Sequence, residues 1–177
     1  MKYLFINFIS ILIMKNIIIF TDGAVPNNQK KGTRKGGVGV FFGIDDPRNI
    51  SYSMIESSSN KVTNQVCELT VCIMAIETLL TTQKIKNNIE LYTDSMYIVN
   101  SINTWAKNWE KNNWKKSTNE PILNLTLIKK LYYLSKNVPI KFIHIKAHTK
   151  PPSNESPEYY LWFGNYMADK LAVNATK

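Results

Sequence analysis

The order of its elements predicts an α/β fold for this chain, built on a five-stranded mixed sheet with helices on both faces. Two observations predict it. Short runs rich in β-branched and aromatic residues come first and are separated by turns, whereas later runs of the same kind alternate with longer segments that have apolar residues at helical spacing. Strands joined by a turn pair antiparallel, and strands joined through a helix run parallel. The sheet should therefore combine a three-strand antiparallel meander with two parallel strands.

The meander is predicted from the first part of the chain. Ile17–Phe20 is a continuous apolar run, which is typical of a strand covered on both faces at the centre of a sheet. Gly36-Gly37 leads into a second run at Val38–Phe42, and Asp45-Asp46-Pro47 then turns the chain into a third run at Ile50–Ile55. These three strands should follow one another as two hairpins.

A long buried helix should come next. From Asn64 to about Lys84 the apolar residues recur at helical spacing over a wide arc, and Thr63 or Asn64 is available to cap the first turn. The remaining elements follow from the same patterns: a strand at Ile89–Thr93, helices at Ser95–Ala106 and Pro121–Ser135, a strand at Ile140–Ile145, and a final helix at Gly164–Ala175.

Composition suits a single domain with a polyanionic partner. A chain of 177 residues with 44% hydrophobic content can bury one well-packed core. Its 22 Lys and Arg against 13 Asp and Glu give a net charge of +9, which favours a polyanion, although a role in solubility could produce the same charge. Cys67 and Cys72 lie in a predicted helix at a spacing that suits neither a disulfide framework nor a tetrahedral metal site. They indicate core residues of an intracellular protein in a reducing compartment, cytoplasm or nucleus, that is not secreted.

The first fourteen residues are mostly apolar, which is also typical of a signal peptide or a membrane anchor. The run is short for a membrane span, it is interrupted by Asn7 and Ser10, and no small-residue cleavage site precedes the first strand. Met14 would make a natural second start directly before that strand. We therefore expect residues 1–14 to be a dispensable N-terminal extension and residues 15–177 to be one domain, monomeric and without stable membrane association.

Four acidic residues predict a metal site at one edge of the sheet. Asp22 and Asp94 each follow a short apolar strand, and the carboxyl ends of parallel strands meet at the same edge. Glu68 should lie in the first turn of the connecting helix and lean over this edge, and Asp169 should approach from the last helix. Crowded carboxylates stay ionised only beside cations, and Mg²⁺ prefers oxygen ligands that include substrate phosphates. Any one of these acids alone would indicate a turn or cap residue, but four in this order indicate a site.

Several motifs follow one another in a recognisable order. They are Phe20-Thr21-Asp22-Gly23, then Thr63-Asn64-Gln65 with Glu68-Leu69, then Thr93-Asp94-Ser95-Met96-Tyr97, then Trp105, Trp109 and Trp114 with Lys115, and finally Gly164-Asn165 with Ala168-Asp169 and Leu171-Ala172. In this order and spacing they resemble ribonuclease H of type 1, in its cellular eukaryotic form, over about residues 15–177. The resemblance implies the ribonuclease H-like fold, in agreement with the sheet predicted above.

The resemblance also implies an activity: endonucleolytic cleavage of the RNA strand of an RNA/DNA hybrid by residues 15–177, leaving 5′-phosphate and 3′-hydroxyl ends. Asp22, Glu68, Asp94 and Asp169 match the acids that bind two Mg²⁺ ions in this family, for which Mn²⁺ can substitute. His148 matches a histidine on a mobile loop that helps proton transfer or product release. On its own, a histidine after a strand would indicate an ordinary surface residue.

The resemblance extends to positions that contact the hybrid. A lysine, Lys61, stands where an arginine is common, which keeps the charge but loses the bidentate fork. The stretch from Trp105 to Lys116, rich in tryptophan and lysine, matches the family's basic protrusion, in which we expect Trp105 to be partly structural and Trp109 to face the groove. The matching residues are Asn28, Asn64, Gln65 and Met96 toward the RNA strand, Lys61, Thr63 and Asn124 in a phosphate pocket for the DNA strand, Tyr97, Trp109 and Ser117 in a DNA channel, and Trp105 in the protrusion. Alone, Asn28 would indicate a turn and Asn64 a helix cap.

The chain departs from the family pattern in one segment, and two other functions are alternatives to hybrid cleavage. The segment 149–163 is longer than usual and rich in proline and aromatic residues, and we expect a long loop over the active site. A non-catalytic hybrid-binding module on the same fold is an alternative that predicts a lost acid, whereas all four are present. A proofreading exonuclease would carry Asp-x-Glu on its first strand, whereas Asp22 is followed here by Gly23-Ala24.

Overall fold

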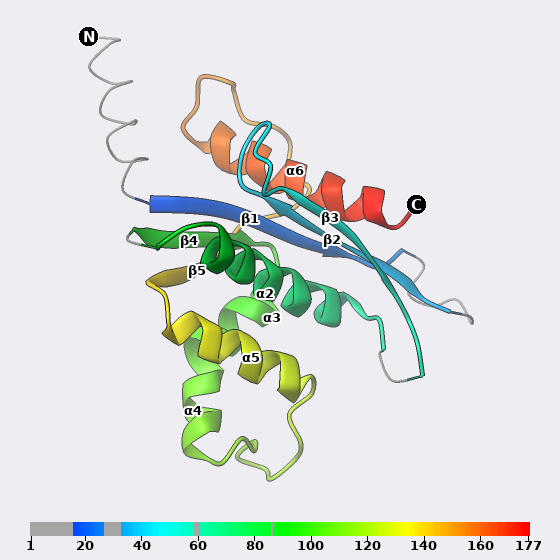
Figure 1. The fold of residues 1–177 in the computed structure, drawn as a ribbon, viewed down its shortest axis with the longest axis vertical. Helices are drawn as coiled ribbons and strands as arrows, with labels where there is room; N and C mark the ends of the chain where they lie inside the picture. Colours follow the sequence, from blue (N-terminus) through cyan, green and yellow to red (C-terminus); the bar gives the residue numbers. More distant parts are fainter. Residues whose placement is uncertain (1–15, 27–32, 59–60, 86) are drawn as a thin grey trace.

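The computed structural model describes residues 16–26, 33–58, 61–85 and 87–177, so residues 1–14 and Asn28 lie outside the described part of the chain. A single sheet separates two layers of helices in Figure 1. Helix α6 (Glu158–Ala175) covers one face, and α2 (Asn64–Thr82) with α5 (Leu125–Lys136) lies on the other. The predicted arrangement of helices on both faces is confirmed.

The sheet has the predicted topology. Its spatial order is β3-β2-β1-β4-β5, with β1 at the centre. β1 pairs antiparallel with β2 and parallel with β4, which in turn runs parallel to β5. The strands are β1 (Asn16–Ala24), β2 (Lys35–Phe41), β3 (Ile50–Ile55), β4 (Asn88–Thr93) and β5 (Ile140–His144).

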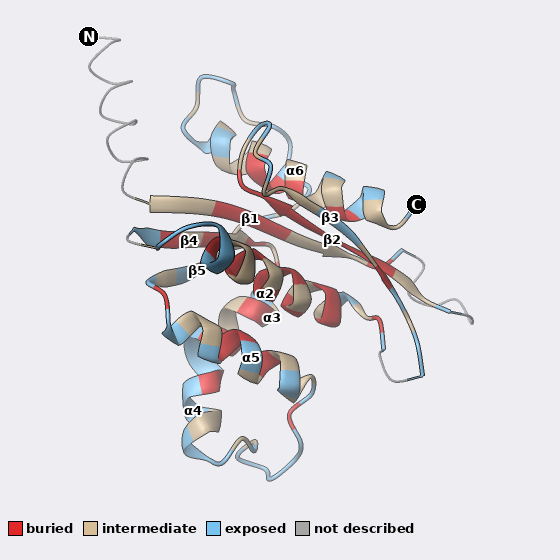
Figure 2. Ribbon diagram, viewed as in Figure 1, coloured by how far each residue is buried: buried red, intermediate tan, exposed pale blue. Residues whose placement is uncertain are grey.

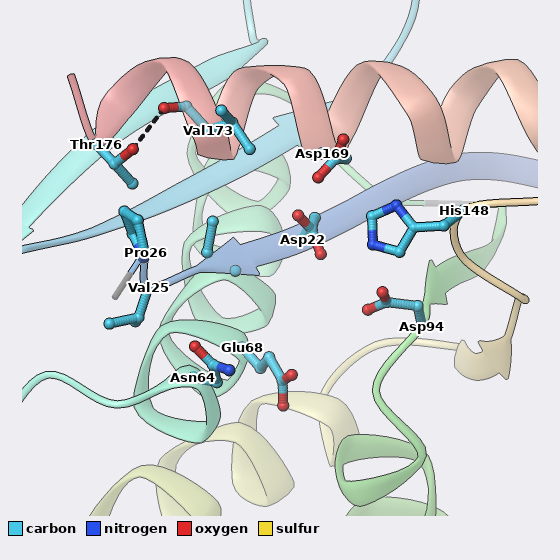
Figure 3. Close-up of a pocket in the computed structure, with 12 residues that line it drawn as sticks. Asp22, Val25, Pro26, Asn64, Glu68, Asp94, His148, Asp169, Val173 and Thr176 are labelled. Atoms are coloured by element: carbon cyan, nitrogen blue, oxygen red, sulfur yellow. Dashed lines mark hydrogen bonds between the residues drawn. The ribbon is translucent and has the colours of Figure 1, made fainter. Parts of the chain in front are cut away.

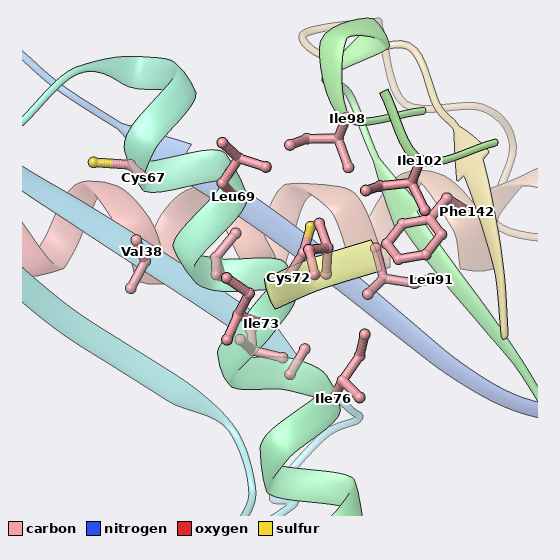
Figure 4. Packing of buried hydrophobic residues seen from close by; sticks show 14 of the residues in the cluster. Val38, Cys67, Leu69, Cys72, Ile73, Ile76, Leu91, Ile98, Ile102 and Phe142 are labelled. Atoms are coloured by element: carbon pink, nitrogen blue, oxygen red, sulfur yellow. The ribbon is translucent and has the colours of Figure 1, made fainter. Parts of the chain in front are cut away.

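The main core lies between the sheet and α2. Ile73 and Ile76 of this helix pack among buried sheet residues such as Ile19 and Leu91, as Figure 4 shows for part of the cluster. Figure 2 shows the same burial as a band along β1, β2 and α2. In the part of the chain that the structure describes, α2 is the one helix long and apolar enough to cross a membrane, but half of that apolar stretch is buried inside the fold. Its composition is therefore explained by core packing.

The second core lies between the sheet and α6, and two glycines allow close contact there. Phe20, Phe41 and Ala168 are buried between the sheet and α6. A Cβ added at Gly39 would overlap the carbonyl oxygen of Ala168, and one added at Gly37 would overlap that of Ala172. Without side chains at these positions, the backbone of β2 approaches the backbone of α6 directly. This close packing fixes the height of α6 above the sheet.

The helix predicted at Ser95–Ala106 is wrong in detail. The structure has α3 (Met96–Asn100), a π-helical turn η1 (Ser101–Trp105) and then α4 (Ala106–Lys111). A π-helical turn takes more residues per turn than an α-helix, so it changes the faces that later residues present. Apolar periodicity alone does not reveal such a turn.

The last two helices begin at other residues than predicted. α5 begins at Leu125 rather than Pro121, because Asn124 has a left-handed backbone with φ of 56°. α6 begins at Glu158 rather than Gly164. Gly164 lies inside the helix, at a position where a Cβ would overlap the ring of Phe20. The expected loop at 149–163 is therefore too long, and the segment between His148 and α6 is 149–157.

Candidate metal and nucleic-acid site

Two of the four carboxylates lie side by side at one edge of the sheet. Thr21 of β1 pairs with Thr93 of β4 in parallel register, so Asp22 and Asp94 follow neighbouring positions. Asp22 still belongs to β1, where it pairs with Gly39 of β2, whereas Asp94 lies just beyond the end of β4. The chain thus places both acids at the edge that the sequence predicts.

Helices supply the other two carboxylates. Asp169 lies on α6 above β1, and Glu68 lies on α2 on the opposite side of the sheet. Glu68 is the fifth residue of α2, so it lies in the second turn, and the expectation of a first-turn position is wrong. The helix begins after Thr63, whose side chain accepts a hydrogen bond from the backbone N–H of Val66. This cap fixes the residue at which α2 begins.

The four acids and His148 line one pocket of about 360 Å³. Figure 3 shows Asp22, Asp169 and Asp94 gathered around the imidazole of His148, with Glu68 and Asn64 on the far side. His148 follows β5 and has a left-handed backbone with φ of 52°. Five segments remote in sequence therefore contribute to the same pocket, and the first of them continues from Asp22 to Val25 and Pro26 after β1.

The electrostatics of the pocket disfavour negative charge. Burial, then the neighbouring carboxylates Asp94 and Asp169, raise the pKa of Asp22 from 3.8 to about 7. Burial also raises the pKa of Asp94, against the opposing effect of His148. Burial raises the pKa of Glu68 as well, against a hydrogen bond from Ser95. These carboxylates require a positive counter-charge to be ionised together.

This set of residues fits a divalent cation with a preference for oxygen. The pocket offers four carboxylates whose charges repel one another, which is the chemistry that hard cations neutralise. As the side chains lie, no three His, Cys, Asp or Glu residues in the described ranges are grouped closely enough to hold one ion. The carboxylate of Glu68 instead accepts a hydrogen bond from the Ser95 hydroxyl. The donor chemistry therefore fits a metal, and Glu68 would exchange this hydrogen bond for the ion.

Some predicted substrate residues come together beside this pocket. Asn64 lines it with the carboxylates. The next residue, Gln65, accepts a hydrogen bond from the Asn124 amide at 3.4 Å, and the Tyr97 hydroxyl donates to the Leu123 carbonyl at 3.4 Å. The start of α2 and the residues before α5 are thus joined into one surface.

The remaining predicted contact residues lie outside the carboxylate pocket. Met96 is exposed at the start of α3, and Ser117 is exposed in the loop after α4. Lys61 is exposed and lines an open pocket with Thr33 and Glu56. Thr63 has its hydroxyl engaged as the cap of α2, which is a structural role beside the one expected for it.

Two tryptophans of the protrusion, Trp105 and Trp109, form an aromatic cluster with Tyr97. Trp105 packs against Trp109 with ring centroids 5.7 Å apart, and against Tyr97 at 6.5 Å. Trp105 is 38% exposed, whereas Trp109 is half-buried and packs against the core. Trp105 therefore has a partly structural role through these ring contacts, and the expectation that Trp109 faces the groove stays a prediction.

Sequence reasoning missed the residues that hold this protrusion in place. Glu110 accepts a hydrogen bond from the Tyr132 hydroxyl at 2.9 Å and pairs with Lys136 at 2.9 Å. Trp114 packs edge-on against Tyr132 at 5.7 Å. His144 was also missed, and it acts on Asp94 from the end of β5. Its place as the last residue of β5 was a usable signal, whereas the contacts of Glu110 are with residues too far away in sequence for a local pattern to reveal.

Comparison with known proteins gives consistent matches. The RNase H family model matches residues 14–177. Ribonuclease H of Clostridium botulinum is 36% identical over 163 residues, which are 92% of this chain and 96% of that protein. Ribonuclease H1 of Homo sapiens is 31% identical over 161 residues, which are 91% of this chain but 50% of the human protein. A foamy viral protease-reverse transcriptase solved in complex with an RNA/DNA hybrid has a similar fold, with a TM-score of 0.66 and 18% identity over 90% of this chain and 20% of that one.

Proposed function

This chain belongs to the ribonuclease H family of endoribonucleases, and we propose that it cuts the RNA strand of RNA/DNA hybrids at the pocket described above. One observation carries the proposal. Asp22, Glu68, Asp94 and Asp169, with His148, line a single pocket at the edge where β1 and β4 end. The family gives the class of reaction, and this pocket is where the chain concentrates groups able to perform it.

The four carboxylates would hold two divalent metal ions, Mg²⁺ with Mn²⁺ as a substitute. When bound, such ions supply Lewis acidity to the attacking water and to the leaving oxygen of an in-line displacement. Asp22, the most central of the four, is held between the charges of Asp94 and Asp169, which explains why it gains most from a counter-charge. Cleavage of the bond between phosphorus and the 3′ oxygen would leave 5′-phosphate and 3′-hydroxyl ends.

His148 would handle protons at the same place. It is exposed, lines the pocket, and lies close enough to Asp94 to lower the pKa of that carboxyl. An imidazole exchanges protons near neutral pH, so His148 can give a proton to the leaving 3′ oxygen and regain one from solvent.

The hybrid would lie across the face that carries the start of α2, α3 and the protrusion. Recognition requires that the two strands be distinguished, since RNA and DNA backbones differ chiefly in the 2′-hydroxyl. Asn64, Gln65 and Met96 would contact the RNA strand. For the DNA strand the contacts would come from Lys61, Thr63, Tyr97, Trp105, Trp109, Ser117 and Asn124, and Asn28 keeps its expected role outside the described residues.

The remaining expectations are proposals as well. Residues 15–177 would suffice for activity as a monomer, with residues 1–14 dispensable. Cys67 and Cys72 are free and buried, which supports a reducing compartment.

Cleavage of an end-labelled RNA tests the proposal directly. The RNA is offered in a hybrid with DNA, alone, and in duplex with RNA, each in Mg²⁺ and in excess chelator. Cutting of the hybrid alone, only in Mg²⁺, with products that accept a further nucleotide at the 3′-hydroxyl, is the expected result. Binding of the hybrid without cutting would overturn the proposed activity in favour of a non-catalytic binding module.

A further inference from the structure

Helix α6 carries an aromatic row that the predicted site does not use. Tyr159, Trp162 and Tyr166 recur at spacings of three and four residues, which places them on one face of the helix. Tyr159 and Trp162 have ring centroids 5.7 Å apart, and Trp162 and Tyr166 are stacked at 5.4 Å with an interplanar angle of 8°. We call these three residues the α6 aromatic row.

The row points away from the core. Its inward neighbour Phe163 packs edge-on against Phe41 of the sheet at 6.0 Å, so Phe163 accounts for the apolar anchoring of this part of the helix. Tyr166 is 43% exposed, and Tyr159 and Trp162 are each partly exposed. Three adjacent aromatic rings with exposed surface are therefore left beyond what packing requires.

The row begins at the candidate active site. Trp162 and Tyr166 line a cavity of about 60 Å³ together with His148 and Asp169, two residues of the carboxylate pocket. On its other side Trp162 lines an apolar groove of about 330 Å³, whose walls include Pro152. The indole N–H of Trp162 donates to the Thr149 carbonyl at 3.0 Å, which fixes the segment after His148 against the row. A strand leaving the carboxylates along α6 would meet these rings next.

Lysines accompany the rings. The ammonium of Lys170 lies 5.9 Å from the centroid of the Tyr166 ring. Lys146 lines both the cavity and the groove, and Lys150 lines the groove. Glu158, the first residue of α6, also lines the groove, whereas Lys146 also lines the cavity that His148 and Asp169 share.

We propose that the α6 aromatic row with Lys146, Lys150 and Lys170 binds unpaired nucleotides that continue from a hybrid held at the carboxylate pocket. Bases that are free to unstack can lie on the rings of Tyr and Trp, and lysines neutralise the phosphates between them. A paired duplex keeps its bases stacked on one another and has no free face to offer. The proposal rests on the proposed function, because it takes the end of the bound hybrid as the starting point of the strand.

The test compares one short hybrid with blunt ends to the same hybrid carrying a single unpaired extension of about eight nucleotides, a length within the range that one single-strand site covers. Four extended substrates place the extension at the 5′ or 3′ end of the RNA or of the DNA. Binding is measured by fluorescence anisotropy in chelator, so that no substrate is cut. Cleavage of the blunt hybrid in Mg²⁺ is measured separately.

Wild-type protein should bind at least one extended hybrid about fivefold or more tightly than the blunt one, since stacking on one base alone supplies such a factor. Trp162→Ala and Tyr166→Ala should lose this gain, and Trp162→Phe should keep most of it. Lys150→Gln combined with Lys170→Gln should reduce the gain and its dependence on salt. Tyr52→Ala and Lys141→Gln are matched controls at exposed positions of β3 and β5, and should change nothing.

The outcomes separate the two proposals. No gain from any extension, or an equal loss of blunt and extended binding in Trp162→Ala with Trp162→Phe no better, would overturn the aromatic row. The lysine variants change exposed residues, so they remain informative if Trp162→Ala fails to fold. A wild-type protein that gains affinity from an extension but cuts no hybrid would overturn the proposed function and leave the row standing.

Discussion

The hydroxyl of Ser95 donates a hydrogen bond to the carboxylate of Glu68 while its oxygen accepts one from the backbone N–H of Ile98 at 3.4 Å. Ser95 is thus the N-cap of α3 and the partner of a candidate metal ligand on α2. The hydroxyl is buried, and it joins two helices on the same side of the sheet to one corner of the pocket.

Replacing Ser95 by Ala should therefore have two effects. The free energy of unfolding should fall by about 1 kcal/mol because α3 loses its cap. The Mg²⁺ concentration that gives half-maximal cleavage should fall severalfold, because Glu68 no longer has to exchange the hydrogen bond from Ser95 for the ion. Urea unfolding and a Mg²⁺ titration of cleavage measure the two. Ser95→Thr keeps the hydroxyl and is the control; equal effects of Ala and Thr would contradict this role.

Asp22→Asn should reduce cleavage by at least about 1,000-fold, because it removes the charge of the most central carboxylate in a site that depends on metal. Affinity for the hybrid should change by less than about threefold, since the groove is left intact. Single-turnover cleavage and anisotropy measure these. Asp45→Asn, in the exposed turn after β2, is the matched control. A fully active Asp22→Asn protein would refute the site assignment.

The same substitution should stabilise the metal-free protein at neutral pH. The fold raises the pKa of Asp22 from 3.8 to about 7, so it favours the protonated carboxyl. Stability from this group is fully present below about pH 4 and is lost as pH rises through 7. Metal-free wild type should therefore lose on the order of 4 kcal/mol relative to Asp22→Asn between pH 4 and pH 8. Thermal unfolding in chelator measures the difference, and a constant gap across this range would speak against the raised pKa.

Trp109→Ala should weaken hybrid binding about tenfold without changing the dependence of cleavage on Mg²⁺, because the aromatic cluster of the protrusion lies away from the carboxylates. Titration of the hybrid in chelator and of Mg²⁺ at saturating substrate measures the two effects. Since Trp109 is half-buried, Trp109→Phe serves as the variant that retains packing. A shifted Mg²⁺ dependence in Trp109→Ala would disprove the separation.

Gly39→Ala should destabilise the fold by about 3 kcal/mol or more, because its Cβ would overlap the backbone of α6 at Ala168. Cleavage should fall beyond the loss of folded protein, since Asp169 is the next residue on that helix. Gly43→Ala is the matched control: its Cβ would meet its nearest neighbour at 4.0 Å. Denaturant unfolding and specific activity per folded molecule are the measurements, and similar results for the two variants would contradict the close-packing argument.

Local sequence patterns were sufficient to predict the sheet but not the ends of the helices. The β-branched run at Ile17–Phe20 and the helical spacing from Asn64 reflect burial directly, so β1 and α2 were predicted. The start of α6 was predicted too late, at Gly164, which is an interior position of the helix where a Cβ would overlap the ring of Phe20, far away in sequence. The left-handed Asn124 and the π-helical turn η1 depend on tertiary packing in the same way.

The candidate site shows the same division. The edge shared by Asp22 and Asp94 followed from strand order alone, because parallel strands end together. The engagement of Glu68 by Ser95 and the greater exposure of Trp105 than of Trp109 did not, since each depends on the rotation of a helix about its own axis. A spacing pattern gives the face of a helix only while the helix remains regular.

The pocket collects carboxylates from β1, α2, the end of β4 and, last in chain order, α6. During synthesis on the ribosome, a nascent chain that ends before residue 169 would already contain β1, α2 and the protrusion while lacking the fourth acid. Such a chain could meet a hybrid before it could complete the pocket. Release of α6 from the exit tunnel, and its docking on Gly37 and Gly39, would then be the step that completes the pocket and allows a bound hybrid to be cut.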